Sequence, residues 1–291
     1  MHGFGSYHPV VNMVYFVAVI GFSMLFMHPA ALILSFLCAF SYSVLQGGKK
    51  KILINLLYMI PMTIIATAVN TLFNHEGVTI IDYLPSGNPL TLESIVYGVA
   101  ASIMLINVIC WFSCYNKVMT SDKFIYLFGR IIPSLSLMLS MTLRFVSRFK
   151  TQFKSVVNTQ KCIGRDMSGG IIRRAKSGLS ILSVMITWSL ESSLDTADSM
   201  KSRGYGLEGR TAFSIFKFSK RDVVTLFLIL VLSTYVLAGT ILGAVDFKYF
   251  PKFKYMGGDV FGISVFISYF ILLALPIIIE TGEKIKWKLL R

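Results

Sequence analysis

Residues 223–245 read VVTLFLILVLSTYVLAGTILGAV and contain no charged side chain. About 20 consecutive apolar residues form a helix long enough to cross the hydrocarbon core of a bilayer. This run therefore predicts a transmembrane helix. The composition of the chain agrees, because hydrophobic residue types make up 55% of its 291 residues and charged types only 14%. We expect a membrane protein and exclude a soluble enzyme built on one core.

Five further runs have the same character, so the sequence predicts an all-α, polytopic membrane protein with about six transmembrane helices. The six runs are Val10–Met27, Ala30–Leu45, Ile52–Phe73, Ser94–Tyr115, Val223–Val245 and Val260–Ile279. His28 and Pro29 alone separate the first two, which predicts a tight helical hairpin, because proline starts helices well and ends them badly. Asn55, Asn70 and Asn107 are polar exceptions within the runs, and we expect them to form hydrogen bonds between helices.

Basic residues in the loops orient these helices, since Lys and Arg near the ends of spans favour the cytoplasmic side. Lys49, Lys50 and Lys51 place the loop after the second helix inside, and both termini with it. The loop Asn74–Glu93 then lies outside, and it carries acidic residues but no Lys or Arg. In this orientation Lys248, Lys252 and Lys254 would lie outside, against the positive-inside rule. The basic residues of the other loops outweigh these three. We expect a multi-pass protein of the cell membrane with cytoplasmic N- and C-termini.

The stretch Asn116–Asp222 holds most of the positive charge. The chain has 28 Lys and Arg against 14 Asp and Glu, and 18 of these basic residues fall in this stretch together with seven acidic ones. Its two apolar patches, Ile131–Val146 and Gly178–Leu190, are short and interrupted by serines. If both patches crossed the membrane, the eight basic residues from Arg148 to Lys176 would lie outside, against the positive-inside rule. The patches therefore predict amphipathic helices of a cytoplasmic domain.

The sequence thus predicts three segments. Residues 1–115 contain the first four transmembrane helices. Residues 116–222 form a cytoplasmic helical coupling domain, and residues 223–291 contain the last two transmembrane helices and a basic tail.

The sequence lacks the patterns that would indicate an enzyme or an ion carrier. Gly47 to Lys51 has neither the spacing nor the Ser/Thr of a phosphate-binding loop. The apolar runs hold almost no ionisable residue of the kind that marks an ion path. Glu191, Asp195 and Asp198 share one helical face, which we interpret as a solvated acidic stripe rather than a metal or acid/base cluster. We expect no catalytic residue, no cofactor, no bound metal and no nucleic-acid partner.

The acidic stripe leads into Met200-Lys201-Ser202-Arg203-Gly204-Tyr205. A helix is expected to end there, because Gly204 can adopt the left-handed cap conformation. Arg203 would then project from the carboxyl end of a rigid helix, with five donors in a fixed fork that suits carboxylates on another protein. The plainer alternative is that Arg203 only caps the last carbonyls of its own helix.

The run from Ser189 to Tyr205 strongly resembles the second coupling motif of the transmembrane T component of energy-coupling factor (ECF) transporters, the CbiQ/EcfT-like family. Leu143-Arg144-Phe145 is similar to the Leu-Arg-Phe start of the family's first coupling helix. His8-Pro9-Val10-Val11-Asn12 is similar to the usual opening before the first span. The order of apolar block, basic helical domain and apolar block matches over nearly the whole chain.

This resemblance implies a scaffold without catalytic activity of its own. The T component joins a small membrane-embedded, substrate-binding S component to two cytoplasmic ABC-type ATPases, for uptake of a micronutrient such as a vitamin or a metal ion. ATP is hydrolysed on those partners, and the two coupling helices dock into grooves on them. Ser202, Arg203 and Gly204 would form the second coupling contact. The S component, and not this chain, would set the substrate.

The first coupling motif departs from the family pattern, which has Ala-Arg-Gly at the end of both coupling helices. Here Cys162, Ile163 and Gly164 follow Gln160-Lys161, so isoleucine stands where arginine is expected. Gly164 is retained, and Arg165 comes directly after it. Either Ile163 makes an apolar contact or Arg165 takes over the lost one.

We expect the S component to bind the apolar faces of Ile131–Val146 and Gly178–Leu190. The small residues that would permit close approach there are Ser134, Ser136, Ser140 and Gly178. Two other functions stay open as alternatives. A permease of an ordinary ABC importer would carry a Glu-Ala-Ala loop with a distal glycine, which the sequence does not contain. A membrane-anchored enzyme or receptor would use the positive charge to bind lipid.

Overall fold

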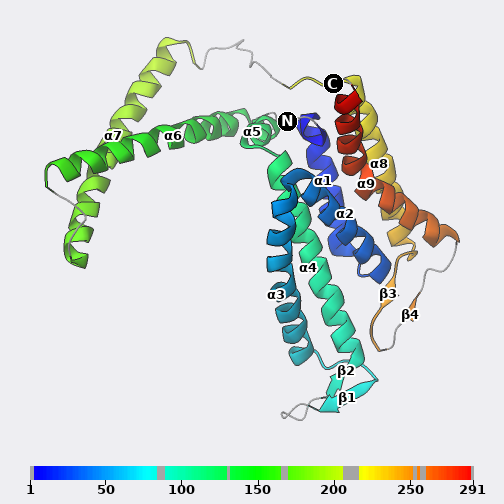
Figure 1. Cartoon of the computed structure of the whole chain (residues 1–291). Coiled ribbons are helices and arrows are strands. Elements are labelled where there is room, and N and C mark those ends of the chain that lie inside the picture. Colours follow the sequence, from blue (N-terminus) through cyan, green and yellow to red (C-terminus); the bar gives the residue numbers. More distant parts are fainter. Residues whose placement is uncertain are drawn as a thin grey trace. The chain divides into compact units, whose positions relative to one another are not determined.

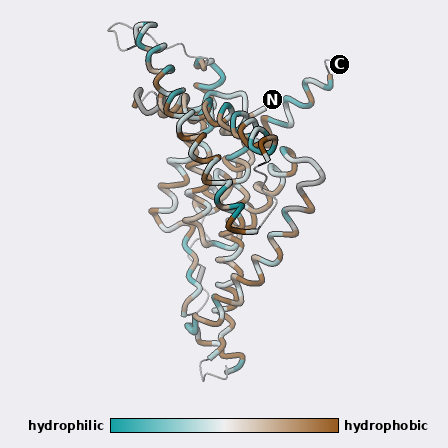
Figure 2. Tube along the Cα trace, turned by 90° about the vertical axis from the view of Figure 1, so that its left-hand side faces the viewer, coloured by the Kyte–Doolittle hydropathy of each residue, from teal (hydrophilic) through white to brown (hydrophobic). Residues whose placement is uncertain are grey.

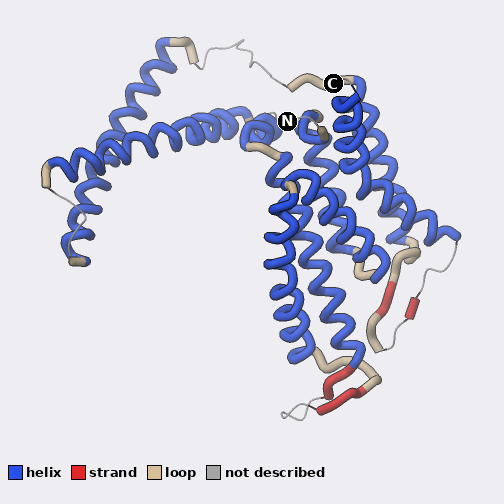
Figure 3. Tube along the Cα trace, in the orientation of Figure 1, coloured by secondary structure: helices blue, strands red, loops and turns tan. Residues whose placement is uncertain are grey.

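The computed structural model describes residues 3–83, 89–129, 132–164, 170–205, 216–251, 254–255 and 260–289. Its regular structure is almost entirely helical (Figure 1; Figure 3), which confirms the predicted all-α, polytopic membrane protein. The helices are α1 (Pro9–Leu25), α2 (Pro29–Gly47), α3 (Lys49–Phe73), α4 (Leu92–Val118), α5 (Ser121–Gly129), α6 (Pro133–Cys162), α7 (Ile171–Ser202), α8 (Lys220–Ile241) and α9 (Val260–Leu289). A short 3-10 helix, η1, covers Phe4–Ser6, and β1 (Ile80–Tyr83) pairs with β2 (Pro89–Thr91), as β3 (Phe247–Lys248) does with β4 (Lys254–Tyr255).

The chain divides into two compact units. Met1–Lys123 and Phe216–Arg291 form the first unit, and Phe124–Ile215 form the second. The first unit contains α1 to α4, α8 and α9. The second contains α6 and α7 together with the greater part of α5.

The first unit holds the helices that can cross a membrane. α2, α4, α8 and α9 are long and apolar enough to do so by length and composition, and α1 and the segment Leu57–Phe73 of α3 are shorter apolar helices. Every predicted run therefore lies largely within a helix. α9 extends ten residues beyond its predicted end at Ile279, into the basic tail. Figure 2 shows hydrophilic residues at this C-terminal end. There Lys284 forms an ion pair with Glu280 one turn earlier, at 3.7 Å.

α1 and α2 begin in the same way. Pro9 and Pro29 each occupy the first turn, where the missing N–H costs no helical hydrogen bond. The side chain of the preceding histidine accepts a hydrogen bond from the helix: His8 from the Val10 N–H at 3.3 Å, and His28 from the Ala30 N–H at 3.1 Å. This geometry confirms the tight turn predicted at His28-Pro29.

Polar side chains tie the apolar helices of the first unit together. Asn107 of α4 donates to the Leu32 carbonyl of α2 at 3.0 Å, and Asn55 of α3 donates to the Ser43 hydroxyl of α2 at 3.0 Å. Both asparagines therefore bond between helices as predicted. The prediction is wrong for Asn70, whose buried side-chain oxygen has no hydrogen-bond partner among the described residues. Trp111 of α4, fully buried, donates its ring N–H to the Ser35 hydroxyl of α2 at 3.2 Å. Lipid tails are as apolar as the helix surfaces, so the hydrophobic effect does not drive helices together in a membrane. Hydrogen bonds between helices, such as these, help to hold them together instead.

The N-terminal segment contacts the residue at which the chain leaves the first unit. The Lys123 ammonium is buried and donates to the Gly5 carbonyl and, at 3.1 Å, to the Val118 carbonyl. With the Asn12 amide oriented so that its nitrogen donates to the Phe4 carbonyl at 3.0 Å, its oxygen accepts from Lys123 at 2.9 Å. Burial lowers the pKa of Lys123.

The same segment contacts the residues at which the chain returns. Asp222, buried in the first turn of α8, accepts from the backbone N–H of His8 at 3.3 Å and from the Ser219 hydroxyl at 2.6 Å. The His8 ring stacks on Phe218, with ring centres 3.7 Å apart. Within the first unit, the N-terminal segment thus contacts both Lys123 and Asp222, whereas the sequence indicated only a family-like opening there.

Candidate functional site at the ends of two long helices

α6 and α7 pack against each other within the second unit. Val156 of α6 and Ile181 and Met185 of α7 form a buried apolar contact. Nearer the N-terminus of α6, Phe145 stacks on Trp188 of α7, with ring centres 5.6 Å apart and ring planes 21° apart. Because later residues of α6 meet earlier residues of α7, the two helices run in opposite directions.

The predicted apolar patches lie in these two helices, except for Ile131, which is outside the described residues, and Ile132, the N-cap residue of α6. Phe145 of the first patch and Ile181 and Met185 of the second pack between the two helices. Ile181 and Met185 are 3% and 2% exposed, so they face α6 and cannot contact another protein. Leu182, Ile186 and Leu190 of α7 stay exposed.

α7 ends as the sequence predicted. Arg203 is its C-cap residue, and Gly204 follows with φ 71°, the left-handed conformation that glycine adopts without strain. The Gly204 N–H bonds to the Lys201 carbonyl at 3.0 Å, and the Tyr205 N–H bonds to the Met200 carbonyl at 3.1 Å. This pair of bonds is the Schellman motif, which satisfies the last carbonyls of the helix through the backbone. The Arg203 side chain is exposed and makes no side-chain hydrogen bond or ion pair with a described residue, so it does not cap its own helix.

α6 ends with the same geometry. Ile163 is its C-cap residue with φ −83° and ψ 5°, against φ −84° and ψ 10° for Arg203. Gly164 follows with φ 79°, and its N–H bonds to the Lys161 carbonyl at 3.0 Å. Ile163 thus occupies the same backbone position as Arg203, and its side chain is 66% exposed. Arg165, the other candidate for this contact, lies outside the described residues.

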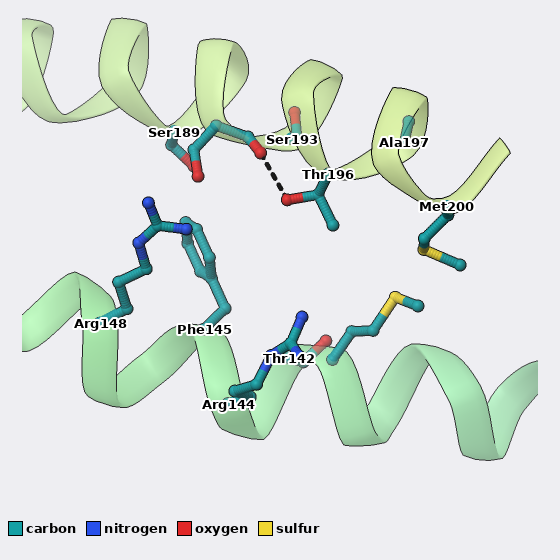
Figure 4. Close-up of a pocket in the computed structure, with 11 residues that line it drawn as sticks. Thr142, Arg144, Phe145, Arg148, Ser189, Ser193, Thr196, Ala197 and Met200 are labelled. Atoms are coloured by element: carbon teal, nitrogen blue, oxygen red, sulfur yellow. Dashed lines mark hydrogen bonds between the residues drawn. The ribbon is translucent and has the colours of Figure 1, made fainter. Parts of the chain in front are cut away.

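Two adjoining grooves lie between α6 and α7. The larger, of about 460 Å³, is lined on the α7 side by small residues, Ser189, Ser192, Ser193, Thr196 and Ala197. On the α6 side, Figure 4 shows Arg144 and Arg148 on either side of Phe145. The smaller groove, of about 280 Å³, shares Met141, Arg144 and Met200 with the larger one. It extends to Arg203 and Tyr205 at the end of α7.

Of the residues predicted for the S-component surface, the structure describes the side chain of Ser140 and the backbone position of Gly178, and these two lie near opposite ends of α7. Ser140 lies in the smaller groove near the end of α7. Gly178 lies near the opposite end of α7, and a Cβ added there would meet no atom within 4 Å. The side chains of Ser134 and Ser136 lie outside the described residues. This surface stays a prediction.

From the sequence, Arg144 was only part of the Leu143-Arg144-Phe145 motif match and Arg148 had no role, whereas the structure places both in the grooves. A signal was present, because the two arginines are four residues apart and so lie on one helical face. The acidic stripe Glu191, Asp195 and Asp198 is exposed and lines neither groove. Among the described residues there is no group of three or more His, Cys, Asp or Glu side chains that could hold a metal ion.

Comparison with known proteins supports the resemblance. No family model matches the chain. It is 36% identical over 97 residues to the energy-coupling factor transporter transmembrane protein EcfT of Lactobacillus helveticus, a match covering 33% of this chain and 35% of that relative. It is 33% identical over 104 residues to the protein of the same name from Lactococcus lactis, covering 35% of this chain and 39% of the relative.

A longer match, to the protein of the same name from Acidaminococcus fermentans, is 30% identical over 148 residues and covers 47% of this chain and 55% of the relative. The chain therefore matches between about a third and about half of the length of these curated relatives. It is similar to the transmembrane T component of ECF transporters, as its motifs indicated.

Proposed function

We propose that this chain is the scaffold and coupling subunit of an ECF-type importer. It joins two cytoplasmic ABC-type ATPases to a small membrane-embedded S component and takes part in the uptake of a micronutrient. One observation carries the proposal: α6 and α7 end in the same C-cap geometry, followed by a left-handed glycine, at the two positions where the family carries its coupling motifs. The shared name of the relatives supports it.

The two helix ends act as rigid contacts to the ATPases. The backbone satisfies the last helical carbonyls at Arg203, which leaves its guanidinium available for a partner's carboxylate. Ile163 offers an apolar contact at the equivalent position. When the ATPases close on ATP, the helix ends move with them, and the packed pair of α6 and α7 passes this motion on to the S component.

The proposal places residues 116–222 and both termini on the cytoplasmic side of the cell membrane. Eight basic residues from Arg148 to Lys176 support this orientation, because Lys and Arg are disfavoured in external loops. The exposed apolar residues of α7, Leu182, Ile186 and Leu190, are available for the S component. The S component, rather than this chain, determines which substrate is transported.

The test is purification of the full-length chain from its native membranes with an affinity tag. We expect two ATPase chains with phosphate-binding loops and one small, very apolar membrane protein in stoichiometric amounts. ATP-driven uptake by the reconstituted complex should be lost in Arg203→Ala, and membrane insertion should not. Lys201→Ala, an exposed basic residue on the same turn, is the matched control. A chain that purifies alone, or one whose uptake survives Arg203→Ala, contradicts the proposal.

A further inference from the structure

Arg144 and Arg203 come from different helices and line the same groove. Arg144 lies in the N-terminal half of α6, and Arg203 is the C-cap residue of α7. The other lining residues of this groove of about 280 Å³ are Leu137, Ser140, Met141, Met200 and Tyr205. None of them is acidic, so the groove presents two guanidinium groups beside the apolar side chains of Leu137, Met141 and Met200.

Neither arginine has an anionic partner in the described part of the chain. Arg144 and Arg203 are exposed and make no ion pair or side-chain hydrogen bond with a described residue. Arg148, one turn further along α6, differs because it lies over the Trp188 ring, 5.7 Å from its centre. Two cations at one groove repel each other unless an anion lies between them. A carboxylate suits both, since each guanidinium can donate two parallel hydrogen bonds to it.

We propose that this groove is a carboxylate-binding site, in which Arg144 and Arg203 together hold one acidic side chain of the ATPase partner. The inference rests on the proposed function and adds Arg144 to the docking contact. The groove, of about 280 Å³, has room for a single acidic side chain. Met141 and Met200 supply flexible apolar contacts for the rest of that side chain.

At this site, a single side chain of the partner would bind both helices. A carboxylate bound by Arg203 alone would contact only the end of α7. A carboxylate shared with Arg144 also holds α6, 19 residues before its C-cap at Ile163. Arg144 is therefore a second binding residue, which links α6 as well as α7 to the same carboxylate while the ATPases move.

The test is a double-mutant cycle on the full chain, incorporated with its S component into nanodiscs and titrated with the purified ATPases. Arg144→Ala and Arg203→Ala should each raise the dissociation constant at least about tenfold. The double variant should be little worse than the weaker-binding single variant, because both remove the same shared contact. Arg144→Lys should lie between wild type and Arg144→Ala, since it keeps the charge but loses the fork. Lys150→Ala, an exposed basic residue of α6 outside both grooves, should bind as wild type.

Other results overturn the inference. Wild-type affinity in Arg144→Ala, or effects of the two substitutions that simply add, mean that no carboxylate is shared. An effect of Arg144→Ala that disappears in nanodiscs of zwitterionic lipid assigns the groove to a lipid phosphate. If Arg144→Ala and Arg203→Ala lower the thermal stability of the chain equally in the absence of the ATPases, the groove binds an acidic residue of the chain itself. If Arg203→Ala also binds normally, the proposed function fails at this contact as well.

Discussion

Ile163 and Arg203 occupy equivalent backbone positions with opposite side-chain chemistry. Under the proposed function, an ATPase surface that received Ile163 could not hold an unpaired buried carboxylate, because isoleucine supplies no donor and an unmatched buried charge costs several kcal/mol. If Ile163 makes the first contact, the two docking contacts would therefore differ, one held by charge and one by burial. Such a pair suits two non-identical ATPases but does not require them.

We predict that Ile163→Arg weakens recovery of the complex, because it places a charge against an apolar surface. The loss should be about tenfold or more in affinity, whereas Ile163→Val should bind close to wild type. Complex recovery after affinity purification measures both variants.

Arg165→Ala is the informative comparison for this prediction. If Ile163 makes the contact, Arg165→Ala has little effect. If Arg165 has taken over the lost arginine contact, the order reverses, and Arg165→Ala becomes the damaging substitution.

Lys123 provides a second prediction at the scale of one residue. Lys123→Met leaves the Gly5 and Val118 carbonyls without their donor, and each buried unsatisfied polar group costs about 1–3 kcal/mol. We expect a thermal unfolding midpoint several degrees lower in detergent, measured by the fluorescence of the tryptophans.

Lys123→Arg should recover part of this loss, because it keeps a cationic donor at the site. Lys220→Met is the control, since Lys220 is exposed at the start of α8. Equal midpoints for Lys123→Met and wild type would show that the buried ammonium does not stabilise the first unit.

At the scale of elements, α8 and α9 are held together by a close approach at Gly239. A Cβ added at Gly239 would lie 2.5 Å from Cγ2 of Val265 on α9 and 3.0 Å from its Cγ1. Small residues at such points let helix backbones come close and gain packing contacts in a membrane.

We predict that Gly239→Val forces α8 and α9 apart and destabilises the first unit by about 1–3 kcal/mol, the usual cost of overpacking. The same change at Gly21 in α1, where a Cβ would meet no atom within 4 Å, should have a much smaller effect. Thermal unfolding in detergent compares the two. A larger loss at Gly21 would contradict the close packing of α8 and α9.

At the scale of the whole molecule, the proposed topology makes residues 116–222 cytoplasmic. Cysteines placed at Lys154 and Arg173, both exposed, should resist membrane-impermeant thiol reagents in intact cells and react after the membrane is permeabilised. The background needs Cys162→Ser, because Cys162 is exposed while Cys38, Cys110 and Cys114 are buried.

A cysteine at Glu76, exposed in the loop Asn74–Glu93, is the matched control and should react in intact cells. Labelling at Lys154 or Arg173 before permeabilisation would reverse the topology of the central segment.

Several features followed from the sequence alone because they depend on local chemistry. The apolar runs located the helices of the first unit, since a span requires only length and hydropathy. Gly204 located the end of α7, because its lack of a Cβ favours the left-handed cap whatever the rest of the fold does. Likewise, Pro29 indicated where α2 begins.

Features that join distant parts of the chain appeared only in the tertiary structure. Periodicity marked the apolar faces of α6 and α7. It could not show that Ile181 and Met185 of α7 pack against Val156 of α6 and are therefore not available to another protein. Nothing local brings Lys123 to Gly5, or Arg144 into one groove with Arg203. These pairs are set by how whole helices pack, and packing is a property of all the contacting surfaces together rather than of any one stretch of sequence.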